Sequence, residues 1–266
     1  MGKRRLDVLL LERGLVESRE KARAVVMAGA VLVDEQAAIK PAGLVDEGAD
    51  LRLVEGPKYV SRGGDKLEHA LDTFGIDPAG AVAADIGAST GGFTDCLLQR
   101  GATRVYAIDV GKGQLDYRLR VDPRVIVMEG VNARYIEPLP EPVDLIVVDV
   151  AFISLRQVLP PALALLRPGS QRLASGTKAR LKPGLQGDRE GEIVALFKPQ
   201  FEAQRREVGK GGVIRDPLLH ATLIGRFAAW CVREGLRIRG LTASPLLGAS
   251  GNREFFFRLA PGGAAP

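Results

Sequence analysis

A glycine-rich turn that directly follows a short apolar run constrains the fold of this chain more than any other feature of its sequence. Residues 80–86 (GAVAADI) have the composition of a buried parallel strand, and a helical pattern begins at Cys96. The turn between them, residues 87–95, has the glycine spacing G-x-x-x-G-G. A strand, a glycine turn and a helix in this order bring backbone N–H groups close to a ligand at the carboxyl edge of a parallel sheet. The spacing matches neither the dinucleotide fingerprint nor the phosphate loop, which disfavours NAD and ATP as ligands.

Polar side chains recur where the apolar runs end. Three of the runs end in an aspartate, at Asp85, Asp109 and Asp149, and Asn132 follows a further run. Asp109 lies 22 residues beyond Gly87, close to the offset of about 20 residues at which an acid binds ribose hydroxyls. A buried carboxylate is unfavourable unless it is paired or bound to a ligand. Three of them beside a glycine turn therefore indicate a ligand site.

These residue types suit S-adenosylmethionine, which has a nucleoside, no phosphate chain and a cationic sulfonium. Asp109 is predicted to hold the ribose, Asp85 and the glycine turn the methionine part, and Asn132 the edge of the adenine. No metal site is predicted. The predicted cofactor-binding residues are Asp85, Gly87, Ala88, Ser89, Thr90, Gly91, Gly92, Phe93, Asp109, Val110, Asn132 and Asp149.

The first 56 residues differ from the remainder, because two short helical patterns are followed by short β-like runs. Ser18 is expected to cap the second helix, residues 19–27. Residues 1–25 carry seven Lys and Arg against four Asp and Glu, and Arg19 and Arg23 lie near the start of that helix. On charge alone, a face that contacts nucleic-acid phosphates and an ordinary solvated helix surface both remain open.

The motifs of this N-terminal part resemble the small RNA-binding module of alpha-L type, first described in a small-subunit ribosomal protein. They are Arg5-Leu6-Asp7, residues 14–22 (GLVESREKA), residues 28–33 (AGAVLV) and Lys40-Pro41. The resemblance covers almost all of residues 1–56. It implies that the module binds structured RNA through the face that carries Arg5, Arg19 and Arg23.

The remainder of the chain is similar to the TlyA (hemolysin A) family in several separate segments. They are residues 59–67 (YVSRGGDKL), 85–95, 149–155 (DVAFISL), 198–202 (KPQFE) and 251–255 (GNREF). The resemblance implies an alpha-L module fused to an FtsJ-type methyltransferase with a Rossmann-like, doubly wound α/β sheet. It also implies the activity, which is transfer of a methyl group from S-adenosylmethionine to the ribose 2'-oxygen of cytidine in ribosomal RNA.

FtsJ-type enzymes use a Lys-Asp-Lys-Glu tetrad, which the resemblance assigns to Lys66, Asp149, Lys198 and Glu254. A ribose hydroxyl is a poor nucleophile at neutral pH, so it must be deprotonated or hydrogen-bonded as it attacks the methyl group. A lysine amine can do this where burial or nearby cations favour its neutral form. Lys198 is expected in this role with Asp149 orienting it, while Lys66 and Glu254 complete the charge network. Arg62 is an expected RNA contact.

Four parts of the chain are predicted. They are an RNA-binding module (residues 1–56), a linker (57–64), a methyltransferase domain (65–260) and a disordered tail (261–266). A long basic stretch, residues 168–192, is expected to be a mobile loop near the active edge that contacts RNA or is simply disordered. Residues 217–233 have helical periodicity, and their aromatic side chains are expected in the core rather than on a base-stacking surface.

The composition narrows the remaining alternatives. Hydrophobic residues make up 46% and charged residues 26% of the chain, as in ordinary globular proteins. Cys96 and Cys231 lie in apolar segments, as expected for buried thiols in a reducing cytoplasm. Ribosomal RNA or ribosomal subunits are the expected partners, and no interaction with a membrane is expected. A non-enzymatic RNA-binding or ribosome-assembly factor remains an alternative. A membrane-lytic protein would need an amphipathic or spanning segment, which the sequence does not show.

Overall fold

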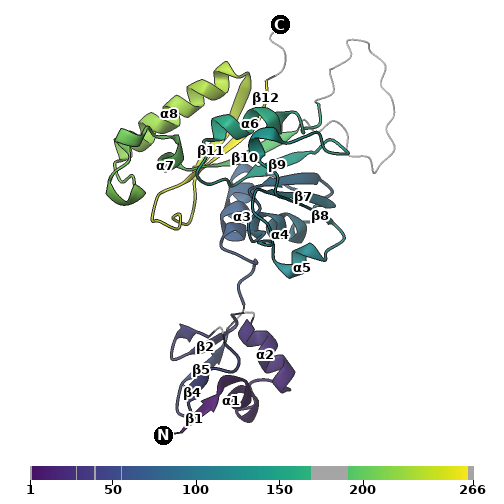
Figure 1. Cartoon of the computed structure of the whole chain (residues 1–266), viewed down its shortest axis with the longest axis vertical. Coiled ribbons are helices and arrows are strands. Elements are labelled where there is room, and N and C mark those ends of the chain that lie inside the picture. Colours follow the sequence, from purple (N-terminus) through teal and green to yellow (C-terminus); the bar gives the residue numbers. More distant parts are fainter. Residues whose placement is uncertain (1, 28, 39, 55, 169–190, 263–266) are drawn as a thin grey trace. The chain divides into compact units, whose positions relative to one another are not determined.

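The computed structural model consists of two compact units, Met1–Lys58 and Tyr59–Pro266 (Figure 1). The structure describes residues 2–27, 29–38, 40–54, 56–168 and 191–262. Most of the predicted basic loop, residues 169–190, and most of the predicted tail, residues 263–266, lie outside the described residues. Each unit is described by itself.

The N-terminal unit is built from two helices and two small sheets. Helices α1 (Leu6–Glu12) and α2 (Arg19–Met27) pack against each other over buried Leu10 and Val26. Ser18 Oγ accepts a hydrogen bond from the backbone N–H of Lys21 at 3.0 Å, which confirms the predicted cap. The strands are β1 (Lys3–Arg5) paired with β4 (Leu44–Asp46), and β2 (Val31–Val33) between β3 (Gln36–Ala37) and β5 (Leu51–Leu53).

The second unit contains a seven-stranded sheet in the order β11-β12-β10-β9-β6-β7-β8. The strands are β6 (Val82–Ile86), β7 (Arg104–Asp109), β8 (Val125–Glu129), β9 (Leu145–Val148), β10 (Glu192–Phe197), β11 (Leu236–Ala243) and β12 (Phe255–Pro261). Strands β6 to β10 are parallel, whereas β12 runs antiparallel to both of its neighbours. The predicted Rossmann-like α/β sheet is confirmed. Two end residues differ from expectation, since Asp85 lies inside β6 rather than at its tip, and Pro261 pairs with Leu236 in β12.

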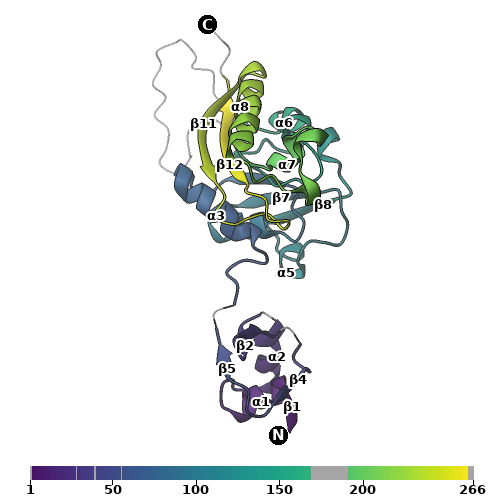
Figure 2. The same cartoon turned by 90° about the vertical axis from the view of Figure 1, so that its left-hand side faces the viewer.

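Helices cover both faces of this sheet (Figure 1; Figure 2). The helices are α3 (Gly63–Phe74), α4 (Gly92–Gln99), α5 (Tyr117–Arg120), α6 (Leu155–Leu163), α7 (Pro199–Glu202) and α8 (Pro217–Arg233), with short 3₁₀ turns η1 (Ala133–Tyr135), η2 (Arg205–Glu207) and η3 (Lys210–Gly212). Helices α3 and α4 pack on one face of the sheet, and α6 and α8 on the other. Helix α8 has the predicted bounds, and its Phe227 is buried in the core as expected.

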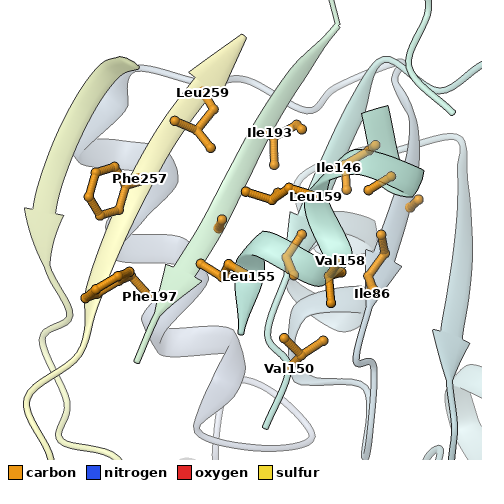
Figure 3. Packing of buried hydrophobic residues seen from close by; sticks show 14 of the residues in the cluster. Ile86, Ile146, Val150, Leu155, Val158, Leu159, Ile193, Phe197, Phe257 and Leu259 are labelled. Carbon is orange, nitrogen blue, oxygen red and sulfur yellow. The ribbon is translucent and has the colours of Figure 1, made fainter. Parts of the chain in front are cut away.

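Alternate residues of each central strand supply the two cores. In β9, Ile146 and Val148 belong to the cluster under α6 and α8, whereas Leu145 and Val147 belong to the cluster under α3 and α4. Such alternation is dictated by a strand whose successive side chains point to opposite faces. Figure 3 shows the first cluster, in which the strand residues Ile86, Ile146 and Ile193 lie beside Val158 and Leu159 of α6.

The order of the strands also determines where a ligand binds. After β6 the chain continues to β7 and β8 on one side of it, while β9 and β10 lie on the other side. In such open sheets the crevice lies outside the carboxyl ends of the strands where the winding direction reverses. That point lies between β6 and β9, at the glycine turn and Asp149.

Candidate active site

The glycine turn approaches the end of β9 so closely that a side chain would not fit. Gly87 has φ +89°, and a Cβ atom on it would lie 2.3 Å from the backbone oxygen of Asp149. Glycine is therefore required here both for its backbone conformation and for its lack of a side chain. The same turn is attached to β7, because the backbone N–H groups of Gly87 and Ala88 both donate to Ile108 O.

Asp109 holds the turn from the end of β7. One carboxylate oxygen accepts from the N–H of Ser89 at 2.8 Å, and the other accepts from the N–H of Gly111 at 2.6 Å. Each oxygen of a carboxylate can accept a second hydrogen bond, so both retain capacity for a ligand hydroxyl. Asp109 lines a hollow of about 560 Å³ together with Val110, Asn132 and neighbouring apolar residues. The mixture of apolar walls and a few polar groups is typical of a site for a nucleoside.

A second hollow, of about 370 Å³, is lined by Lys66, Asp149, Lys198 and Glu254. The four residues come from helix α3, the ends of β9 and β10, and the segment before β12. Lys198 Nζ lies 2.5 Å from Asp149 Oδ1, and Lys66 Nζ donates to Glu254 Oε2 at 2.6 Å. The side chains of the two lysines are only 13% and 12% exposed. The structure therefore brings together two ion pairs whose members are far apart in the sequence.

The two hollows adjoin at the edge between β6 and β9. Gly87, Ser89, Asp149 and Ala151 line both of them. A ligand whose nucleoside lies beside Asp109 would therefore extend past Asp149 to Lys198. The turn residues Ala88, Thr90, Gly92 and Phe93 line the second hollow, as does Arg62.

Asp85 is placed differently from the other strand-end carboxylates. It is fully buried and is not among the described residues that line either hollow. Thr94 Oγ1 donates to its Oδ2 at 2.7 Å, while its Oδ1 has no hydrogen-bond partner in the structure. Burial, with the nearby charges of Asp149 and Asp109, raises the pKa of Asp85 to about 7.

Comparison with known proteins identifies both units. Residues 59–260 match the model of the FtsJ-like methyltransferase family, and residues 4–51 match that of the S4 domain. A Mycobacterium tuberculosis protein named 16S/23S rRNA (cytidine-2'-O)-methyltransferase TlyA is 42% identical over 96% of this chain and 89% of its own length. The chain belongs to the TlyA group of FtsJ-like methyltransferases. The family predicted from the sequence is thereby confirmed.

Two further relatives of this FtsJ-like methyltransferase support the assignment. A Bacillus subtilis (strain 168) protein provisionally named rRNA methyltransferase YqxC is 45% identical over 97% of this chain and 85% of its own length. A solved structure from Streptococcus thermophilus, which carries a provisional hemolysin name, has a TM-score of 0.70 and 40% identity and covers 100% of this chain and 90% of its own. None of the described helices combines the length and apolar character that crossing a bilayer requires.

The cofactor of this FtsJ-like methyltransferase is S-adenosylmethionine, and the residues at the carboxyl edge fit it. The Gly87 turn provides close backbone approach, and Asp109 has acceptor capacity for ribose hydroxyls. Asp85 lines neither hollow, so the lining of the site does not include the predicted contact between its carboxylate and the methionine moiety. Asn132 uses its side-chain oxygen to accept from Arg134 N, which leaves its amide nitrogen for an adenine edge. The individual roles remain predictions.

Sequence reasoning missed two residues at this edge. Phe152 has φ +62°, is 91% exposed and lines the nucleoside hollow, with its ring centroid 5.2 Å from that of Phe201. The side chain of Glu202 is only 2% exposed and accepts from Ser154 Oγ at 2.7 Å and from Leu155 N at 2.6 Å, so it fastens helix α7 to the start of helix α6. Both residues lie in segments that carried the family resemblance, but only the fold shows that these segments meet.

The predicted RNA-contacting arginines of the S4 domain share one partner, Asp7, to which the sequence analysis assigns no role of its own. Arg5, Arg19 and Arg23 all form ion pairs with Asp7, which is completely buried. Arg5 directly precedes α1, and the other two lie four residues apart on α2. The sequence spacing places Arg19 and Arg23 on one helix face, although it does not identify their common partner.

Proposed function

We propose that this protein methylates the ribose 2'-oxygen of cytidine in ribosomal RNA, with its S4 domain holding the RNA. The observation that carries the proposal is the Lys198–Asp149 pair at the junction of the two hollows. It lies where a donor bound along the glycine turn would meet an acceptor. The substrate is that of the tuberculosis relative, as its name states it.

The proposed mechanism uses the two ion pairs for different tasks. S-adenosylmethionine, when bound, supplies a methyl group on a positively charged sulfur. Lys198 Nζ receives the proton of the attacking 2'-hydroxyl, and Asp149 stabilises the ammonium that this forms. Both side chains are largely removed from water, so their orientation is preserved during the reaction.

The second pair positions the substrate rather than moving its proton. Glu254 is 3% exposed and holds Lys66 at 2.6 Å, which directs a positive charge to the wall of the hollow. An ammonium there would bind the ribose or phosphate of the target nucleotide, and Arg62 on the same wall would add a contact to the RNA backbone. The exposed ring of Phe152 offers a surface on which a nucleobase stacks.

The S4 domain serves to deliver the RNA. Arg5, Arg19 and Arg23 are between 40% and 56% exposed, so their guanidinium groups are accessible to phosphates. Binding of ribosomal RNA, either free or within a subunit, by one unit raises the local concentration of the target nucleotide at the other. This explains why the two units occur in one chain.

Mapping of 2'-O-methylated nucleotides tests the proposal directly. Purified protein, S-adenosylmethionine and either deproteinised ribosomal RNA or intact subunits would be incubated, and methylated positions read by primer extension. We expect new 2'-O-methylcytidine with at least one of these substrates. If no substrate acquires the modification while calorimetry still detects binding of S-adenosylmethionine, the proposed acceptor is wrong. If the cofactor gives no binding heat, the alternative of a non-enzymatic RNA-binding factor is favoured. Leakage of lipid vesicles in the same preparations would instead favour a membrane-lytic protein.

A further inference from the structure

The carboxylate of Asp7 lies at the centre of the basic face of the S4 domain. Its side chain has no exposed surface, although three charged side chains surround it. Arg5 binds it with two hydrogen bonds, from Nε at 3.0 Å and from Nη2 at 2.9 Å. Arg19 and Arg23 bind the same Oδ2 atom through Nε, at 3.2 Å and 3.4 Å. A single buried anion on α1 thus contacts three cations, of which two come from α2 and one, Arg5, from the end of β1.

The manner of binding leaves part of each guanidinium available. Arg19 and Arg23 contact Asp7 through Nε, so the edge formed by the two terminal nitrogens is not used in this contact. That edge can bind a phosphate with two parallel hydrogen bonds. Their side chains are 48% and 56% exposed, as a contact to RNA requires.

The other arginines of the unit are held in different ways among its described residues. Arg4 pairs with Glu12 and Glu47, Arg13 donates to the backbone oxygens of Glu47 and Ala49, and Arg52 pairs with Glu35 and Asp50. Where these partners are carboxylates, they are between 44% and 66% exposed, and exposed pairs contribute little to fixing a side chain. The Asp7 cluster is therefore the one that a buried carboxylate organises.

Three guanidinium groups that share one small region repel one another. The carboxylate of Asp7 offsets part of this repulsion and leaves the cluster with a net charge of two positive. Without it, long flexible side chains would separate into water and would lose rotamer freedom on binding RNA. A preorganised cluster has already lost that freedom before the phosphate arrives.

We propose that Asp7, although negatively charged, strengthens RNA binding by holding Arg5, Arg19 and Arg23 together as one phosphate-binding cluster. Asp7 is a positioning residue, since it acts through the arginines. The inference rests on the proposed RNA-binding function of the S4 domain. It makes a prediction opposite to that of simple electrostatics, in which removal of a negative charge from the face should tighten binding of a polyanion.

The test compares two substitutions with the same change of charge in the same unit. Asp7→Asn removes the buried carboxylate, and Glu35→Gln removes an exposed one that pairs with Arg52 at 2.9 Å. Binding of the full-length proteins to deproteinised ribosomal RNA would be measured between 50 and 300 mM salt. We expect Asp7→Asn to bind about tenfold more weakly, with a salt slope smaller by roughly one to two. Glu35→Gln should bind as tightly as the original chain or slightly more tightly.

The outcomes separate this inference from the proposed function. If the original chain binds ribosomal RNA and Asp7→Asn binds it equally or more tightly, the role of Asp7 is wrong and the proposed function stands. If the original chain has no affinity for ribosomal RNA, both are wrong. In methylation assays the loss should appear as a higher KM for RNA rather than as a lower kcat, because Asp7 does not belong to the unit that contains Lys198 and Asp149.

A measurement on the unaltered protein guards against a variant that merely fails to fold. The Nε–H protons of Arg5, Arg19 and Arg23 should exchange with water more slowly than that of Arg52, whose partners are exposed. Nitrogen-15 NMR of the full chain resolves these protons. The slow exchange should persist when RNA binds, because the phosphates engage the terminal nitrogens. Equally fast exchange for all four arginines would overturn the proposal.

Discussion

The two units of this protein use the same kind of ion pair for opposite purposes. In the S4 domain one buried carboxylate holds three arginines whose side chains are 40% to 56% exposed. In the methyltransferase unit two lysines, 12% and 13% exposed, each have a carboxylate of their own. The first arrangement directs permanent charge outward, and the second keeps an amine away from water. This difference is the one we expect between the proposed phosphate-binding surface and the proposed centre of proton transfer.

The choice of cation follows from its chemistry. Arginine remains protonated at any physiological pH and binds phosphate through a planar pair of nitrogens, so it suits contact with RNA. Lysine can lose its proton in a buried site and can therefore accept one from a hydroxyl. Exchanging the two residues is consequently expected to have very unequal effects in the two units.

The largest effect is expected from Lys198→Arg. Arginine preserves the positive charge beside Asp149 but cannot accept the hydroxyl proton, so methyl transfer should fall about a thousandfold, as it should in Lys198→Ala. Binding of S-adenosylmethionine, measured by calorimetry, should change by less than about threefold, since Lys198 does not line the hollow beside Asp109. A Lys198→Arg variant that keeps a tenth of the activity would mean that charge alone suffices, and the contrast between the units would be lost.

The matched exchange in the S4 domain is Arg19→Lys, with a much smaller expected effect. The charge is kept and only the Nε contact to Asp7 and the planar phosphate contact are lost. We expect affinity for ribosomal RNA to fall about threefold, against about tenfold for Arg19→Gln. Filter binding at fixed salt distinguishes the two values. Equal losses in Arg19→Lys and Arg19→Gln would show that the geometry held by Asp7, rather than charge, dominates the contact.

The smallest effects concern the pH dependence of stability, which should have opposite signs in the two units. Hydrogen bonds from Arg5, despite burial, hold the pKa of Asp7 far below its usual value. Ionised Asp7 therefore stabilises the folded S4 domain above about pH 4, the pKa of an unfolded aspartate. This stabilisation is lost as the pH falls further. Burial raises the pKa of Asp85 to about 7. Protonated Asp85 therefore stabilises the folded methyltransferase unit below about pH 4, and this stabilisation is lost as the pH rises to about 7.

Denaturant unfolding between pH 2.5 and 8, followed separately for each unit, tests these signs. Asp85→Asn should flatten the decline in stability of the methyltransferase unit between about pH 4 and 7. Asp7→Asn should reduce the acid sensitivity of the S4 domain below about pH 4. A decline that survives in Asp85→Asn would assign it to another group of the methyltransferase unit.

Much of the methyltransferase unit was predictable because its signals are local. The strand, glycine turn and helix at residues 80–99 follow from periodicity and glycine spacing, and α8 has the predicted bounds. The tetrad was predictable only through family resemblance, since Lys66 and Glu254 lie 188 positions apart in the sequence. Spacing can place two residues on one helix face, but it contains no information about a contact across the sheet.

Contacts between residues that are far apart in the sequence, such as those of Asp7 and Glu202, could not be predicted from local patterns. Asp7 belongs to the motif at residues 5–7, yet its contacts with Arg19 and Arg23 arise only because α1 packs against α2. Glu202 likewise acquires its partners only because the ends of β9 and β10 are neighbours in the sheet. A fully buried carboxylate and an exposed one look identical in a sequence.

The sequence by itself determined the order of the parallel strands β6 to β10 along the chain, the position of the glycine turn and the identity of the ionisable residues. These depend on properties of neighbouring residues, such as side-chain alternation and the freedom of glycine to adopt positive φ. Only the tertiary structure decided which lysine meets which carboxylate, and which charges face water. Those pairings depend on packing between distant segments, and burial sets how strongly a charge is held.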